Sequence, residues 1–299
     1  MMKRLLLLFL ILLIPAAVFA ENNDIIRVSY LGPEGTYTEE AAQFWFQNGE
    51  TFIAQGTVND AIADVIDGSA EFAVIPQENT LGGAVVNYVD ALIKSEDVYV
   101  VGEVVLPINQ TLMGVPGAKL EDIKTVCSHT QGLTQSAQWR QENLPDAVAE
   151  EMSSTAAAAS YVAEKQDKSI AAVAAPGAAE LYGLDVLAEN VQITNANKTR
   201  FYILSPQLQE DERLTRAVFI ADCEGNQLDE LIIAMHDADL NLVSLHDRPE
   251  GSSLGRYYYV IEVEDETGIN DSQINVLGEI EGLRFAGRFN AAEKSIFGE

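Results

Sequence analysis

The sequence has 299 residues, of which 47% are hydrophobic and 21% charged, and its formal net charge is −28. This mixture is typical of globular domains, and the length allows two or three compact units with cores of their own. So acidic a chain repels nucleic acid and anionic membrane surfaces, which excludes both as partners.

The first twenty residues have the pattern of a cleavable secretory signal. Lys3 and Arg4 form a short cationic region, residues 5–14 are an unbroken apolar run, and small residues lead up to Ala20. We expect cleavage after Ala20 and a periplasmic or secreted protein with no membrane attachment. Cleavage removes Lys3 and Arg4 but no acid, so the net charge goes from −28 to −30. An uncleaved membrane anchor is the alternative, although the apolar run is too short to span a bilayer.

Strand-like and helix-like patterns alternate over residues 21–206, which predicts α/β structure with a mostly parallel sheet. The rhythm restarts near residue 110, and two successive α/β blocks indicate two lobes with a ligand site between them. The expected strands are 25–32, 71–76, 98–107, 110–115, 125–128, 169–174 and 199–204, and the expected helices are 38–48 (capped by Thr38), 58–67, 85–94, 130–141, 154–165 and 175–182.

The composition changes after a polar linker at residues 207–212. Residues 213–299 then show the order β-α-β-β-α-β, a ferredoxin-like plan. The expected strands are 215–224, 240–247, 255–265 and 283–289, and the expected helices are 227–238 and 272–281.

Four polar clusters in the first 205 residues stand where predicted helices begin, and the first three of them directly follow predicted strands. They lie at residues 32–38, 76–83, 128–131 and 153–155. Loops at the carboxyl ends of strands in an α/β sheet converge on one crevice, and helix N-termini there favour anions. Each cluster alone also reads as ordinary turn and capping chemistry. Together they indicate a binding site for a small anion, and this site contains no carboxylate pair.

A fifth cluster begins at Asn197 and leads into the last strand of the block. Alternation along this strand places Thr199 and Phe201 on one face and Lys198 and Arg200 on the other. Thr199 therefore faces the expected pocket with Phe201 beneath it. Arg200 either helps to hold an anion or forms a structural salt bridge with one of the many acids.

The segments GPEGTYTEEAA, IPQENTLGGAV, SHTQGLTQSAQWR, SSTAAAA and NKTRF resemble, in order and spacing, the motifs of the prephenate dehydratase family. The resemblance runs from about Ile25 to the end of the chain. The last 87 residues, 213–299, resemble the ACT regulatory domain that follows the catalytic domain in this family. The catalytic domain of the family is similar in fold to type II periplasmic binding proteins.

The resemblance implies a lyase of L-phenylalanine biosynthesis that needs no metal or cofactor. Prephenate would lose its ring carboxylate and 4-hydroxyl to give phenylpyruvate, and arogenate would give phenylalanine. The implied catalytic residues are Thr199, Arg200 and Phe201, with Thr199 on the departing hydroxyl. The implied substrate-binding residues are Thr36, Tyr37, Asn79, Thr80, His129, Gln131, Ser154 and Thr155.

The regulatory part departs from the family pattern, as do Thr130 and Gly132 in the third cluster. The implied effector-binding residues are Gly225, Asn226, Gln227, Leu228, Asp247, Arg248 and Pro249. Polar residues at Asn226 and Gln227 stand where the family has apolar ones, so we expect altered phenylalanine regulation. The family also forms homodimers or homotetramers, which we expect here.

Two other functions fit part of the sequence. An exported chain with two α/β lobes is also typical of a periplasmic solute-binding protein, and a catalytically inactive ACT-bearing sensor is a third reading. The two cysteines, Cys127 and Cys223, are far apart in apolar runs, and we expect them to be buried free thiols in different domains. An exported compartment would permit a disulfide.

Overall fold

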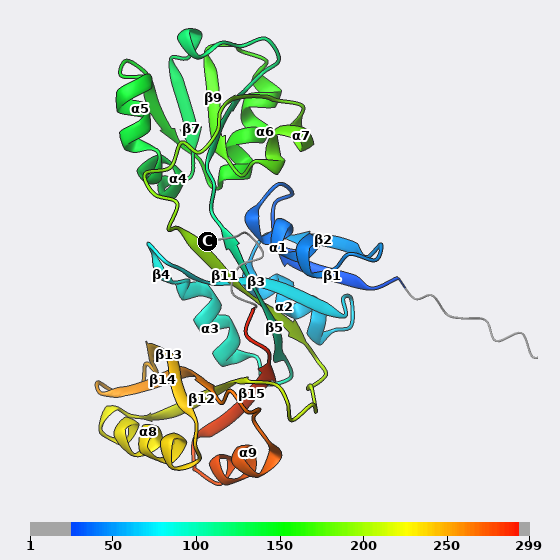
Figure 1. Cartoon of the computed structure of the whole chain (residues 1–299), viewed down its shortest axis with the longest axis vertical. Helices are drawn as coiled ribbons and strands as arrows, with labels where there is room; N and C mark the ends of the chain where they lie inside the picture. Colours follow the sequence, from blue (N-terminus) through cyan, green and yellow to red (C-terminus); the bar gives the residue numbers. More distant parts are fainter. Residues whose placement is uncertain (1–24, 293–299) are drawn as a thin grey trace, which may run out of the picture.

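The computed structural model describes residues 25–292, so the predicted signal sequence lies outside the described residues. The chain forms three β-sheets arranged along its long axis, with helices against each (Figure 1). Over residues 25–292 no helix combines the length and apolar character needed to cross a bilayer.

The first sheet has the strand order β2-β1-β3-β11-β5, with β4 paired to β3. Its strands are β1 (Arg27–Leu31), β2 (Thr51–Gln55), β3 (Phe72–Asn79), β4 (Gly83–Ala84), β5 (Tyr99–Pro107) and β11 (Lys198–Ser205), and its helices are α1 (Tyr37–Trp45), α2 (Val58–Ile66) and α3 (Val86–Lys94). β1 runs parallel to β2 and β3, whereas β11 is antiparallel to both of its neighbours. The chain therefore returns from the second sheet to insert β11 into the middle of the first.

The second sheet has the order β10-β6-β9-β7-β8. Its strands are β6 (Thr111–Gly114), β7 (Thr125–Ser128), β8 (Val148–Glu151), β9 (Ile170–Ala174) and β10 (Asp185–Ala188), and its helices are η1 (Leu120–Asp122), α4 (Thr130–Gln135), α5 (Ala137–Asn143), α6 (Thr155–Lys165) and α7 (Gly177–Tyr182). Residues 108–110 and 189–197 connect it to the first sheet. The two connections are joined by hydrogen bonds from Ile108 N to Asn197 O and from Val191 N to Gln110 O, both 2.9 Å.

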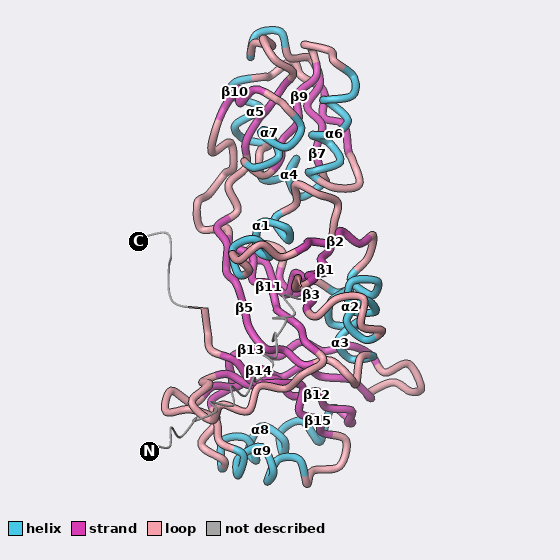
Figure 2. The backbone as a smooth tube through the Cα atoms, turned by 90° about the vertical axis from the view of Figure 1, so that its right-hand side faces the viewer, coloured by secondary structure: helices cyan, strands magenta, loops and turns pink. Residues whose placement is uncertain are grey.

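The third sheet has the order β13-β14-β12-β15 and is antiparallel throughout. Its elements are β12 (Arg216–Glu224), η2 (Gly225–Gln227), α8 (Leu228–Asp237), β13 (Asn241–Pro249), β14 (Arg256–Glu264), α9 (Asp271–Gly278) and β15 (Leu283–Phe289). Helices α8 and α9 cover the face that points away from the first sheet (Figure 2). The order of strands and helices is the β-α-β-β-α-β order expected from the sequence.

The opposite face of the third sheet packs against the first sheet and α3. One core cluster contains Val218, Val260 and Phe289 of the third sheet together with Tyr88 of α3 and Tyr202 of the first sheet. The Tyr202 ring lies edge-on to both Tyr88 and Phe289, with centroid distances of 5.5 and 5.7 Å. This continuous apolar contact fixes the third sheet beside β11.

Most predicted elements are confirmed, but the expected mostly parallel sheet is wrong, because the first and second sheets each mix parallel and antiparallel pairs. The N-cap of α1 is Thr36, whose hydroxyl accepts from Glu39 N, and Thr38 is instead a buried helical residue. The single helix expected over 130–141 is interrupted at Ser136, which ends α4 and begins α5. The sequence patterns also missed β2, β4, β8 and β10. Cys127 and Cys223 are buried free thiols, as expected.

Candidate active site

Thr199 and Asn79 are direct partners in the antiparallel pairing of β11 with β3. Asn79 Nδ2 donates to Thr199 Oγ1 at 2.9 Å and to Asn197 Oδ1 at 2.8 Å. All three side chains are at least 92% buried, since their exposed fractions are 8%, 7% and 1% for Thr199, Asn79 and Asn197. The second and fifth sequence clusters therefore meet in one hydrogen-bonded group.

The turn after β3 is held by the same amide. Asn79 Oδ1 accepts from the backbone N–H groups of Leu81 and Gly82, both at 3.0 Å. Thr80 Oγ1 accepts from Lys198 N at 3.0 Å and can donate to Ala196 O at 3.2 Å. Thr80 thus ties this turn to the segment that enters β11.

The third cluster, on the second sheet, approaches this turn. A Cβ added to Gly82 would lie 3.5 Å from Gln131 Nε2 and 3.7 Å from Asn79 Oδ1, so the Gln131 amide lies beside the Asn79 turn. His129 is the N-cap of α4, where its Nδ1 accepts from Gln131 N at 3.3 Å. Residues from both sheets therefore share one junction.

The fourth cluster begins α6 next to α4. Ser154 caps α6, and its hydroxyl accepts from Ala157 N at 2.9 Å. A Cβ on Gly132 of α4 would lie 3.4 Å from the methyl group of Thr155, which places the two helix starts in contact. Ser154 and Thr155 thus adjoin the same end of α4 that carries His129 and Gln131.

The first cluster lies against both the second sheet and the connection between the sheets. Tyr37 donates its hydroxyl to Asn109 O at 2.6 Å, and burial, followed by the charge of Glu40, raises the pKa of Tyr37. Tyr182 of α7 donates to Glu34 O at 2.7 Å. The hydroxyls of Thr36 and Tyr37 are therefore both engaged within the protein in this structure.

Of the other two expected catalytic residues, Phe201 shares the face of β11 that carries Thr199, and Arg200 does not. Phe201 is 1% exposed and packs in a core cluster with Val28, Tyr30 and Ile203, so it supports the strand from inside. Arg200 is on the opposite face of β11, as alternation predicts, and its guanidinium points toward the third sheet. The structural salt bridge, kept open above as the alternative for Arg200, is the arrangement found.

Arg200 is the centre of a buried polar network between the first and third sheets. Its guanidinium lies 2.9 Å from Glu262, 3.1 Å from Glu78 and 3.5 Å from Glu103. Burial lowers the pKa of Arg200, but the surrounding acids outweigh burial, and the net pKa lies above its ordinary value. Arg200 Nε also donates to Gln77 Oε1 at 2.8 Å, and Gln77 Nε2 lies 3.1 Å from His246 Nε2.

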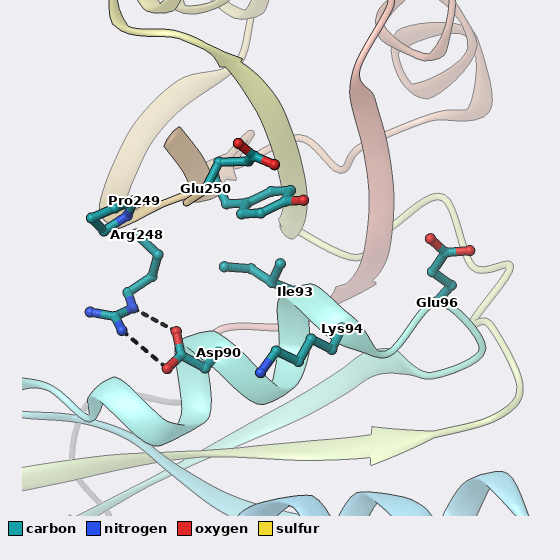
Figure 3. A pocket seen from close by; sticks show the side chains of 8 residues that line it. Asp90, Ile93, Lys94, Glu96, Arg248, Pro249 and Glu250 are labelled. Carbon is teal, nitrogen blue, oxygen red and sulfur yellow. Dashed lines mark hydrogen bonds and ion pairs between the residues drawn. The ribbon is translucent and has the colours of Figure 1, made fainter. Parts of the chain in front are cut away.

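A cavity of about 530 Å³ lies away from Thr199. It is formed by α3 and the ends of β13 and β14, and Figure 3 shows Arg248 reaching across to Asp90, at 2.5 Å. Arg248 and Pro249 line it, with Lys94, Glu96 and Glu250 supplying further charges. The other expected effector residues do not line this cavity; they are Gly225, Asn226, Gln227, Leu228 and Asp247.

Sequence patterns missed several residues that the fold brings to these two regions. Asn197 was seen only as the start of a cluster and Gln77 only as a member of the second cluster, and Asn109 and Glu262 carried no local signal. Within residues 25–292 no three His, Cys, Asp or Glu side chains gather in a way that could hold a metal ion.

Comparison with known proteins identifies the family. The family model "Prephenate dehydratase" matches residues 28–209. A prephenate dehydratase of Lactococcus lactis subsp. cremoris is 31% identical over 264 residues, covering 86% of this chain and 94% of that protein.

Solved structures agree with the sequence comparison. The prephenate dehydratase of Arthrobacter aurescens in complex with L-Phe superposes with a TM-score of 0.80 at 30% identity, covering 90% of this chain and 92% of that one. A protein described as a novel type of quorum quenching acylase superposes with a TM-score of 0.77 at 28% identity, covering 89% and 98%. The dehydratase reading is thereby favoured over a solute-binding protein, and the chain belongs to the prephenate dehydratase family of lyases.

Proposed function

We propose that this chain catalyses the decarboxylating dehydration of prephenate, or of arogenate, at the junction around Thr199. The C–C bond to the ring carboxylate breaks and releases carbon dioxide, and its electron pair enters the ring. The C–O bond at the 4-position breaks in turn, and the hydroxyl takes up one proton and leaves as water. Prephenate, a dianion, and one proton thus give the phenylpyruvate anion, carbon dioxide and water.

The observation that carries this proposal is the hydrogen bond from Asn79 to Thr199, beside a turn that Gln131 of a third motif also approaches. Because the product gains aromaticity, the protein has to orient the substrate and assist the departing hydroxyl. Thr199 is the proposed donor to that hydroxyl. The N-terminal N–H groups of α6 beside Ser154 and Thr155 would help to bind a carboxylate, because helix N-termini favour anions.

Neutral donors suit the charge of this protein. Of the two cations in the fifth cluster, Arg200 is engaged by acids on the far face of β11. Hydroxyl, amide and backbone N–H groups can therefore receive the anionic substrate without a buried countercharge.

Acyl transfer, suggested by the second structural comparison, is less well supported. A hydroxyl nucleophile needs a general base within hydrogen-bonding reach. In residues 25–292 the hydrogen-bond partner of Thr199 Oγ1 is the amide of Asn79, and no His, Asp or Glu side chain bonds to it. This arrangement supports a hydrogen-bond donor more than an activated nucleophile.

Residues 213–299 are proposed to be an ACT regulatory domain that binds phenylalanine. The β-α-β-β-α-β order supports this, as does the L-Phe complex of the Arthrobacter aurescens relative. Arg248 and Pro249, beside the cavity at α3, would contribute to effector recognition. A homodimer or homotetramer is proposed with it, and light scattering that gave a monomer would count against that.

Export is proposed from the sequence of residues 1–20 alone. Intact-mass analysis of protein recovered from the periplasm or medium should give a chain beginning at Glu21. An unprocessed N-terminus would contradict the proposed cleavage.

The test of the main proposal is turnover of the purified protein with prephenate and arogenate in parallel, with and without L-phenylalanine. We expect product from one or both substrates, and a loss of turnover of at least about 100-fold in Thr199→Ala, the lower range for a general acid. Near wild-type activity in Thr199→Ala would remove Thr199 from the mechanism. Tight binding of both substrates with no product would favour a sensor.

A further inference from the structure

Asn197 lies immediately before β11 and is 1% exposed. Its Oδ1 accepts from Asn79 Nδ2 at 2.8 Å and lies 3.3 Å from Thr80 Oγ1. It has no bond to Thr199 itself. The hydrogen bonds that link its side chain to Thr199 therefore pass through Asn79.

The orientation of the Asn79 amide is fixed by its surroundings. Its Oδ1 accepts from two backbone N–H groups, those of Leu81 and Gly82, which only an oxygen can do. Nδ2 must then point toward β11, where its two hydrogens go to Asn197 Oδ1 and Thr199 Oγ1. All four hydrogen-bonding positions of Asn79 are used.

This arrangement determines what the Thr199 hydroxyl can do. Because Asn79 donates to Thr199 Oγ1, the one hydrogen of the hydroxyl must point in another direction. Within residues 25–292 Thr199 donates to no other group. We propose that Asn197 is a positioning residue for the dehydration. By accepting from Asn79, Asn197 keeps the Asn79 amide as a donor to Thr199 Oγ1. The hydrogen of the Thr199 hydroxyl is then left for the departing hydroxyl of the substrate. The inference rests on the proposed role of Thr199.

The other end of the Asn197 amide supports a role in catalysis more than in stability. Asn197 Nδ2 is buried and has no hydrogen-bond partner among the described residues. A buried donor without a partner is destabilising, so the amide is a poor choice for stability at this position. Its oxygen, in contrast, accepts from Asn79 Nδ2. The acceptor oxygen that the side chain presents to Asn79 is therefore the feature that favours asparagine at this position.

The experiment compares Asn197→Leu and Asn197→Asp with the wild-type chain. Leucine matches the size and removes the acceptor, so we expect kcat to fall about 10- to 100-fold, below the full contribution of a general acid, with KM little changed. Aspartate keeps an acceptor oxygen, so kcat should recover, while its added charge should raise KM for an anionic substrate. Recovery of kcat in Asn197→Asp would show that the acceptor oxygen, and not the packing of the side chain, determines the rate.

A double variant tests whether Asn197 acts through Thr199. If it does, Asn197→Leu combined with Thr199→Ala should be no slower than Thr199→Ala alone, measured at high enzyme concentration. Gln273→Leu is the matched control, because it removes a hydrogen-bonded amide from α9 in the third sheet. It should lower the melting temperature and leave kcat unchanged.

Three outcomes would overturn the inference. They are an unchanged kcat in Asn197→Leu, failure of aspartate to restore kcat, and a double variant in which the two losses multiply. The failure of the proposed function looks different, since the wild-type chain itself would then form no product from prephenate or arogenate.

Discussion

Replacing Arg200 by leucine tests whether this cation serves the substrate or the contact between the first and third sheets. The side chain is 14% exposed, and two of its three acidic partners, Glu262 and Glu103, are 1% and 5% exposed. Removing one partner of a buried ion pair typically destabilises a protein by about 3–5 kcal/mol, because a charge is left behind.

The remaining contacts set where in this range the loss should fall. Glu262 keeps its ion pair with Arg216 and accepts from Tyr202, and Glu103 keeps the backbone N–H of Ala292 at 2.7 Å. We therefore expect the lower half, about 3–4 kcal/mol. For a chain of this size such a loss lowers the melting temperature by roughly 6–16 °C.

Thermal melting and steady-state kinetics of Arg200→Leu are compared with those of Arg213→Leu. Arg213 also pairs with an acid, Asp211, but its side chain is 88% exposed, so its loss should change the melting temperature little. Well below the melting temperature, KM of Arg200→Leu should stay close to that of the wild-type chain. A raised KM with an unchanged melting temperature would show that the guanidinium contacts substrate and that our assignment is wrong.

Three further changes test other parts of the structure. Gly287→Ala should lower the free energy of unfolding by at least about 1–2 kcal/mol, because φ is +131° and an added Cβ would collide with the backbone of Val100 in β5. An unchanged melting temperature would contradict the close approach of β15 to β5. Burial lowers the pKa of His246 below its ordinary 6.5, so the unfolded chain binds more protons than the folded chain. The free energy of unfolding should therefore fall as pH drops through about 6.5. Urea titration at pH 5.5 and 7.5 should show that this part of the loss is absent in His246→Gln. Tyr37→Phe removes the hydrogen bond to Asn109 O and should lower the free energy of unfolding by about 0.5–1.5 kcal/mol in the same titration at pH 7.5. No change in stability would mean that this bond is not formed in solution.

Local patterns predicted β11 well because strand alternation is a local property. Thr199 and Phe201 share one face and Arg200 the other, as a period of two requires. The partners of Arg200 could not be predicted in this way, because Glu262 lies 62 residues further along the chain. Only the docking of the third sheet brings the two together.

The missed elements are those whose residues carry little pattern. All four residues of β8 are exposed, so this edge strand shows no apolar alternation. The helix expected over 130–141 has continuous helical periodicity, yet the chain turns at Ser136, whose hydroxyl donates to Gly132 O. Thr36 and Thr38 are both good caps by residue type, and only the backbone conformation selects Thr36.

The charge of the molecule explains why the site is built from neutral groups. The sequence offers one close pair of cations near Thr199. This pair would attract a dianionic substrate if both side chains faced the site. Arg200 instead neutralises acids from β3, β5 and β14, because leaving Glu262 and Glu103 unpaired in the interior would be more destabilising than leaving an exposed anion to solvent. The face of β11 that carries Thr199 then contains hydroxyl and amide groups, each oriented by a neighbour, and these can donate to an anion in a protein whose net charge is −28. One strand thus serves the junction with one face and holds the third sheet with the other, which is why Thr199 and Arg200 are adjacent in sequence and separate in role.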